Sequence, residues 1–181
     1  MLEGEVDRAD YASYLAGLLP GIEALESAVH HSGHLAAAPA GRPRAALLAQ
    51  DLATLRGGPV DLDAAHAACR AAAPRVRDPA VLLGIVYVLE GSRMGASLVL
   101  RRLERHGDPR AWPHRWLETQ ARGAAADWQR VRVALESGLR EPQALAAAAV
   151  AACGAFATVA LGVSMLDGGR PGTGMEQNSA S

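Results

Sequence analysis

Hydrophobic residues recur along most of this chain at the three- and four-residue spacing of amphipathic helices. The first such stretch covers residues 11–31, where the apolar positions in helical register are Tyr11, Tyr14, Leu15, Leu18, Ile22, Leu25 and Val29. Asp7 or Asp10 is placed to cap this helix at its N-terminus. Pro20 and Gly21 interrupt the pattern and are expected to kink the helix.

Proline and glycine residues divide the rest of the chain into further helical stretches. This punctuation predicts a loop over 32–41 and helices over about residues 42–56, 62–73, 78–106, 124–138 and 141–168. Residues 108–122 leave room for a further short helix. No stretch shows strand-length alternation, and no internal repeat is present. The sequence therefore predicts an all-α fold, with one helical domain over 1–168 and a disordered tail over 169–181.

Composition narrows the range of functions. The 181 residues suit one domain with a sizeable core, and half of them are hydrophobic. All 18 basic residues are arginine, the net charge is −1, and no dense arginine run occurs. These features argue against nucleic-acid binding through a broad basic face. Trp112, Trp116 and Trp128 are therefore expected to pack in the interior rather than to stack on bases.

The cysteines and the N-terminal residues indicate a cellular compartment. Cys69 and Cys153 lie far apart, and neither belongs to a CxxC or Cys/His metal-binding spacing. Free thiols in a reducing compartment are the simplest interpretation. The N-terminal segment MLEGEVDRAD has no apolar core of a secretory signal, so we expect a cytoplasmic protein.

Residues 143–166 contain no charged side chain and are long enough to span a bilayer. Most of them are alanine, which adds little driving force for insertion, and no aromatic or arginine belt flanks both ends. We therefore expect a buried central helix of a soluble bundle with no membrane contact. A membrane-inserted helix is the weaker alternative.

Residues 83–103 form the most informative stretch, because they read as one helix and yet contain Gly84, Gly91 and Gly95. Each interior glycine costs a helix about 1 kcal/mol relative to alanine. At 100° per residue the three positions fall within roughly 40° of one another and share one face. Such a face lets a flat ligand or another backbone come close. The spacing of Gly91 and Gly95 alone favours helix packing.

This helix also carries the segment YVLEGSRMG at residues 87–95. On a long helix in an all-helical chain of this size, it resembles the distal-helix motif YVLEGSxxGG of the bacterial heme oxygenase family, and within it the biliverdin-producing type that often accompanies bacterial phytochromes. The matching residues are Tyr87, Val88, Leu89, Glu90, Gly91, Ser92 and Gly95. The chain departs from the motif at Ala96, where a second glycine is usual. Residues 10–29 and 44–55 and the segment at Trp128 resemble other family helices more loosely.

The resemblance implies a heme oxygenase-like helical bundle with heme as both substrate and cofactor. Such a protein uses O2 and an electron donor, such as a ferredoxin or a flavoprotein reductase, to cleave heme to biliverdin, CO and iron. By this resemblance the residues implied in catalysis are Gly91, Ser92 and Gly95 on the distal helix. The residues implied in heme binding are Gly84, Tyr87, Gly91, Gly95, Arg93 and Arg102. No separate metal site is implied.

The family's axial ligand is a histidine on a first helix, about one helix before the segment that here begins at Asp10. Only nine residues precede Asp10, and none of them is histidine. We therefore expect that the first family helix is missing or truncated, and no residue is assigned the axial role. His30, His31 and His34 offer a weaker substitute, since loop histidines usually face solvent.

Several alternatives stay open. Without the axial histidine the chain is alternatively a non-catalytic, degenerate family member that acts as a helical interaction module, packing its glycines against a partner or against itself as a homodimer. The apolar neighbours of Glu90 indicate a buried, hydrogen-bonded acid, and the family resemblance implies a structural tether more readily than a catalyst. The arginines of the distal helix are propionate partners or, more simply, solvated surface residues: Arg93, Arg101, Arg102 and Arg105. The chain has no ExxH pair, which argues against di-iron chemistry.

Overall fold

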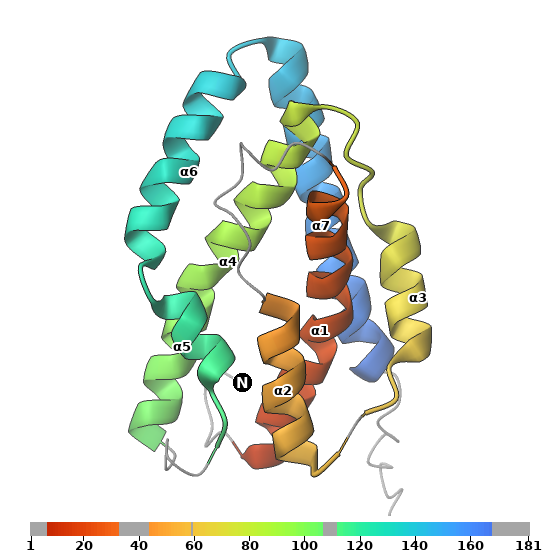
Figure 1. Cartoon of the computed structure of the whole chain (residues 1–181), viewed down its shortest axis with the longest axis vertical. Helices are drawn as coiled ribbons and strands as arrows, with labels where there is room; N and C mark the ends of the chain where they lie inside the picture. The colour runs from red at the N-terminus through yellow and green to blue at the C-terminus, as the bar shows by residue number, and fades with distance from the viewer. Residues whose placement is uncertain (1–6, 33–43, 59, 107–111, 168–181) are drawn as a thin grey trace, which may run out of the picture.

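The computed structural model describes residues 7–32, 44–58, 60–106 and 112–167. Within these ranges the chain forms seven helices and no strand, which confirms the predicted all-α fold (Figure 1). The helices are α1 (Arg8–His30), α2 (Arg44–Arg56), α3 (Asp63–Ala72), α4 (Pro79–His106), α5 (Arg115–Ala121), α6 (Ala124–Gly138) and α7 (Pro142–Asp167). The predicted tail over 169–181 and all but the first residue of the predicted loop over 32–41 lie outside the described residues.

The two longest helices, α4 and α7, set the architecture. They touch near one end of the molecule and diverge toward the other (Figure 1). α1 packs along α7 and carries α2 and α3, whereas α6 and α5 pack along α4. Among the described helices, α6 packs on α4 and scarcely touches α7.

Local signals place the helix ends close to the predicted positions. The Asp7 carboxylate accepts the N–H of Asp10 at 2.7 Å and caps α1. The Asp78 carboxylate accepts the N–H groups of Ala80 and Val81 and caps α4 in the same way. Gly57, with a φ of +74°, ends α2 in the left-handed conformation that favours glycine. α1 runs unbroken through Pro20, at which a kink was predicted.

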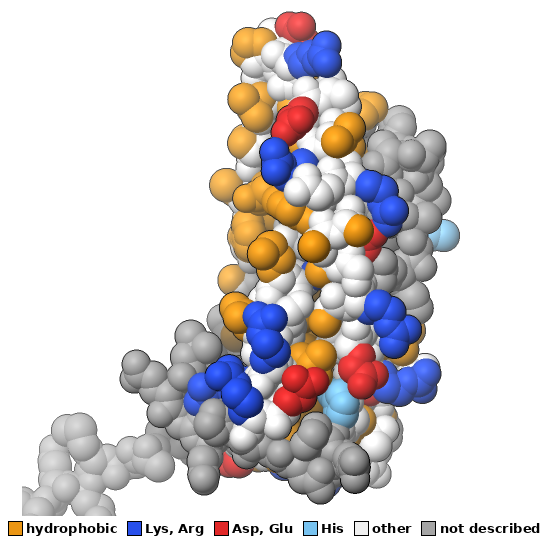
Figure 2. All heavy atoms as spheres, turned by 90° about the vertical axis from the view of Figure 1, so that its left-hand side faces the viewer, with side chains coloured by type: hydrophobic (Ala, Val, Ile, Leu, Met, Phe, Trp, Pro, Cys, Tyr) orange, Lys and Arg blue, Asp and Glu red, His pale blue; other side chains and the backbone are white. Residues whose placement is uncertain are grey.

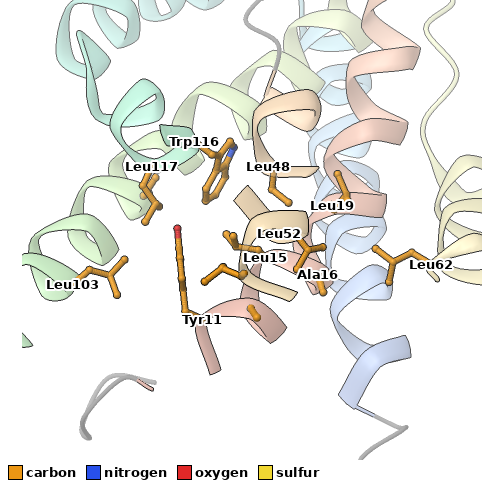
Figure 3. Close-up of a cluster of buried hydrophobic side chains, with 13 residues drawn as sticks. Tyr11, Leu15, Ala16, Leu19, Leu48, Leu52, Leu62, Leu103, Trp116 and Leu117 are labelled. Atoms are coloured by element: carbon orange, nitrogen blue, oxygen red, sulfur yellow. The ribbon is translucent and has the colours of Figure 1, made fainter. Parts of the chain in front are cut away.

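One hydrophobic cluster joins α1, α2, α4 and α5 (Figure 3). Tyr11 and Leu15 of α1 meet Leu48 and Leu52 of α2, and Trp116 of α5 closes the cluster from the other side. All five side chains are buried, and for Tyr11 and Leu15 the helical period of residues 11–31 predicted this. This cluster anchors the part of α4 that follows its three glycines.

α1 and α7 approach each other through small residues. A Cβ atom added at Gly21 would lie 2.7 Å from the Cα of Val159, and one at Gly162 would lie 2.7 Å from the carbonyl oxygen of Gly17. Neither distance is tolerated between real atoms, so the glycines are what allows the two helix backbones to touch. No local pattern in the sequence marks these glycines as packing residues.

The prediction that α7 is a buried central helix is wrong. Only 22% of its most apolar 18-residue window is buried, compared with 56% for α4, and both helices are long and apolar enough to cross a membrane by length and composition alone. Leu145, Val150 and Phe156 are large exposed side chains of α7. Alanine and glycine bring one side of α7 close to α1 and α4, and no described helix covers its other side.

Candidate functional site

The three glycines on one side of α4 meet three different environments. A Cβ atom added at Gly84 would overlap the backbone of Ala148 on α7. At Gly91 the added atom would lie 3.7 Å from the ring of Trp128, which is an ordinary contact. At Gly95 no atom of the described residues comes within 4 Å. Gly84 therefore serves helix packing and also lines the groove described below, so its predicted contact with heme stays a prediction, whereas Gly91 and Gly95 leave room beside the helix.

Large apolar side chains flank the two open glycines. Tyr87, Met94 and Leu98 lie on the same side of α4, with relative exposures of 42%, 60% and 60%. We call these three residues, together with Gly91 and Gly95, the glycine face. Large apolar side chains exposed together on one helix side indicate a binding surface more than single exposed residues would.

A groove of about 610 Å³ continues from the glycine face between α4, α6 and α7. Tyr87 lines the groove, and its ring lies 5.6 Å from that of Trp128, the residue beside Gly91. The apolar walls come from Leu135 of α6, from Leu139 directly after α6, and from Leu145 and Phe156 of α7. Ligand pockets commonly enclose about 300–1,000 Å³ and are mostly apolar, so the groove suits an organic ligand.

The surface view agrees with this description. Figure 2 looks at the molecule from the side of α6 and shows hydrophobic side chains gathered along one edge, in the upper and middle parts. Charged side chains are spread over the remainder of the same face. On the face that Figure 2 shows, the apolar surface is thus concentrated along one edge.

Ser92 is exposed beside the two glycines. Its hydroxyl donates a hydrogen bond to the carbonyl oxygen of Leu89 at 2.9 Å. The hydroxyl oxygen retains acceptor capacity toward water or a ligand. The predicted role of Ser92 in ordering water next to Gly91 and Gly95 stays a prediction.

Arg93 does not lie on the glycine face. It is buried, and its guanidinium contacts the carboxylates of Glu90 and Asp127 at 2.7 and 2.5 Å. Burial disfavours the charged form, but the hydrogen bonds and charges of the two carboxylates outweigh this effect and raise the pKa of Arg93. Both predictions for Arg93, a propionate partner and a solvated surface residue, disagree with this placement.

Glu90 is a buried tether, as the sequence indicated. Its carboxylate receives Arg93 from α4 and also Arg44 from α2. Arg44 in turn contacts Glu26 of α1. Arg102, half-buried near the end of α4, remains the predicted propionate partner on the side of Gly95.

The described histidine side chains lie away from the groove. His31 contacts Ser27 at the end of α1, His66 pairs with Glu23, and His114 approaches Glu118. His34 and the side chain of His106 lie outside the described residues. Within the described ranges, no group of three or more His, Cys, Asp or Glu side chains is placed to hold a metal ion.

The heme oxygenase family model matches residues 1–160 of the chain. The chain therefore belongs to the heme oxygenase family, and its all-α fold agrees with that assignment. No curated protein and no solved structure matches the chain. The open glycines Gly91 and Gly95 are thus part of a heme oxygenase family sequence and lie among exposed apolar side chains of α4.

Several residues of the site were not found from the sequence. Phe156 carried a signal, since it is the only phenylalanine of the chain and stands in an alanine-rich helix. Leu135 and Leu139 follow the ordinary helical period, so no sequence signal distinguishes them from other apolar residues. Asp127 and Arg44, the partners of the buried charges on α4, are far from α4 in sequence, and no local pattern links them to it.

Proposed function

We propose that the chain binds heme on the glycine face and cleaves it oxidatively to biliverdin, CO and iron. The observation that carries the proposal is Gly95, which lies in a heme oxygenase family sequence and has no described atom within 4 Å of its added Cβ position. A flat macrocycle needs a surface without side chains to lie against a helix. Gly91 and Gly95 offer such a surface along one turn of α4.

The residues around the glycines support this assignment chemically. Heme, once bound, supplies both the redox-active iron and the ring that is cleaved. Tyr87, Leu98 and Phe156 would bury the apolar parts of the macrocycle and exclude water from them. The Ser92 hydroxyl would order water at the exposed edge of the glycine face. Arg102 would hold a propionate through charge-assisted hydrogen bonds.

The finer assignments are also part of the proposal. The YVLEGSRMG segment supports the biliverdin-producing type that accompanies bacterial phytochromes, with a ferredoxin or flavoprotein reductase as the electron donor. No described histidine lines the groove, so the proposal assigns the axial position to none of them. Externally added imidazole then tests whether a nitrogen ligand completes the site.

A hemin titration tests the proposed function. Purified chain is titrated with hemin, with and without imidazole, and the Soret band is recorded against hemin in buffer alone. The proposal predicts a saturable Soret shift at about one hemin per chain, followed by reductant-dependent loss of the band and appearance of biliverdin absorbance. A chain that leaves the Soret band unchanged at stoichiometric hemin would falsify the binding claim.

A non-catalytic interaction module is the second candidate function. The observation in its favour is the exposure of Leu145, Val150 and Phe156 on α7, together with a groove that no described histidine lines. This candidate predicts a folded chain that associates with itself or a partner in the absence of hemin. Sedimentation of the apo-chain over a concentration series, alongside the hemin titration, separates the two functions.

A further inference from the structure

We propose that Arg93 is a positioning residue that fixes the rotation of α4 and thereby turns Gly91 and Gly95 toward the bound macrocycle. The inference rests on the proposed function, because the glycine face has to meet a ligand for its orientation to matter. Arg93 itself touches none of that surface. It lies on the buried side of the helix, between the two glycines in sequence.

Helical geometry separates Arg93 from the glycine face. Gly91 precedes it by two residues and Gly95 follows it by two, and two residues correspond to about 200° of rotation around the helix. Arg93 therefore projects from the side of α4 opposite to the glycines. A rotation of the helix that moves the glycines by a given angle moves the Arg93 side chain by the same angle.

Four acceptors define the position of the Arg93 guanidinium. Its Nε donates to the carbonyl oxygen of Gln120 at 2.9 Å, and its Nη2 donates to the carbonyl oxygen of Arg122 at 2.7 Å. Its Nη1 donates to the carboxylates of Glu90 and Asp127. The acceptors come from α4 itself, from the end of α5 and from α6. A planar guanidinium that meets all four has little freedom to turn.

The contacts continue from α4 into three other helices. The Glu90 carboxylate also receives Arg44 of α2, and the Asp127 carboxylate also receives Arg130 of α6. Arg44 reaches Glu26 of α1. Glu26 accepts the backbone N–H groups of Arg44 and Ala45 at 3.0 Å and so caps the first turn of α2. We call the resulting chain of ion pairs the Arg93 cluster, which comprises Glu26, Arg44, Glu90, Arg93, Asp127 and Arg130.

The charges of the Arg93 cluster balance. It contains three carboxylates and three guanidiniums, and the side chains of Glu90, Arg93 and Asp127 are at most 3% exposed. Ion pairs buried to this extent add little net stability compared with apolar packing, because desolvation offsets their attraction. Their directional hydrogen bonds do define one geometry. The cluster is therefore suited to orienting α4.

The glycine face explains why this helix needs such a device. Gly95 has no described neighbour within 4 Å of its added Cβ, and Leu98 and Met94 are mostly exposed. Trp128 packs beside Gly91 and Tyr87, but from Met94 to Leu98 little side-chain packing on that side sets the rotation of α4. Each glycine also weakens the helix by about 1 kcal/mol. The orientation of this segment is therefore defined mainly from the opposite side, where Arg93 lies.

The substitution Arg93→Lys tests the inference. Lysine keeps the charge near Glu90 and Asp127 but cannot reach four acceptors in the plane of a guanidinium. Arg132→Lys, at an exposed ion pair with Glu136 on α6, is the matched control. Asp127→Asn removes a charge and keeps an acceptor, and it serves as the second variant if Arg93→Lys does not fold.

Two measurements are made on each variant. Hydrogen exchange compares the amides of residues 91–96 with those of residues 15–19 in the core of α1, which reports local order without any ligand. Hemin titration reports the Soret maximum and the dissociation constant. We expect Arg93→Lys to speed exchange at 91–96 by about tenfold while 15–19 change little. We also expect it to move the Soret maximum and weaken hemin binding about tenfold.

The outcomes separate this inference from the proposed function. The positioning role is overturned if Arg93→Lys shows the same exchange rates at residues 91–96 and the same hemin spectrum as the native chain. An equal increase of exchange in α1 and α4 also overturns it, because it shows that the cluster only stabilises the fold as a whole. If the native chain binds no hemin, the proposed function fails, and the exchange comparison with Arg132→Lys alone decides whether Arg93 orients the glycine face.

Discussion

Gly84 and Gly95 lie about three turns apart on the same side of α4, and only one of them is free of neighbours. A Cβ at Gly84 would overlap Ala148 of α7, whereas a Cβ at Gly95 would meet no described atom within 4 Å. The divergence of α7 from α4 produces this difference (Figure 1). One row of glycines therefore serves two purposes, helix packing at one end and an open surface at the other.

This difference predicts opposite effects of alanine on folding. Gly84→Ala should lower the free energy of unfolding by about 1–3 kcal/mol, because the added methyl group forces α4 away from α7. Gly95→Ala should raise it by up to about 1 kcal/mol, because alanine favours the helix and nothing opposes it. Urea unfolding followed by circular dichroism measures both. Equal effects at the two positions would contradict the described packing.

The groove predicts a second pair of variants, which should differ in their affinity for hemin. Phe156 lines the groove, whereas Val150 is exposed on α7 outside it. Phe156→Ser should raise the dissociation constant for hemin about tenfold, which corresponds to about 1.4 kcal/mol of lost apolar contact. Val150→Ser, the matched control, should leave hemin binding unchanged. The same change in affinity for both variants would show that the groove is not the binding surface.

The burial of Asp51 predicts that replacing this residue changes the stability of the chain in a pH-dependent way. This carboxylate is buried in α2 and accepts the N–H of Trp116 at 2.8 Å. Burial raises the pKa of Asp51 above its ordinary value of 3.8, although the hydrogen bond offsets part of the rise. The folded state therefore favours the protonated acid, and native stability from this group falls as pH rises from about 3.8 through the raised folded pKa.

Asp51→Asn removes that charge and retains an acceptor for Trp116. The variant should be more stable than the native chain at pH 7, and the difference should shrink toward pH 3, where the native carboxyl is neutral in both states. Thermal unfolding of both chains across this pH range measures the effect. A variant that is less stable at pH 7 would show that the carboxylate charge at Asp51 supports the fold.

The sequence was informative where local chemistry sets the structure. Asp78 before Pro79 and Gly57 after α2 marked helix ends that the structure reproduces within a few residues. The environment of Gly84 could not be predicted, because it depends on where α7, 64 residues further along the chain at Ala148, crosses α4. Such long-range contacts leave no local pattern in a single sequence.

The misplacement of Arg93 has a different cause. Two residues of helix turn a side chain by about 200°, so Arg93 cannot share a face with Gly91 and Gly95. Helical geometry alone was sufficient to place it on the opposite side. Its partner Asp127 was beyond reach, since it lies on α6 and no sequence pattern joins the two. For Phe156 no pattern showed which way the ring points, because α7 is apolar on all sides.

The central claim is that the open glycines of α4 lie against a heme, and a hemin titration of Gly95→Leu tests it most directly. The substituted leucine points into space that is free in the described structure, so the fold should be retained. Ala71→Leu, at an exposed position of α3, adds the same side chain elsewhere and is the control. We predict that the native chain and Ala71→Leu shift the Soret band and saturate at one hemin, while folded Gly95→Leu does so only at a much higher concentration. Equal binding by folded Gly95→Leu and the native chain would contradict the claim.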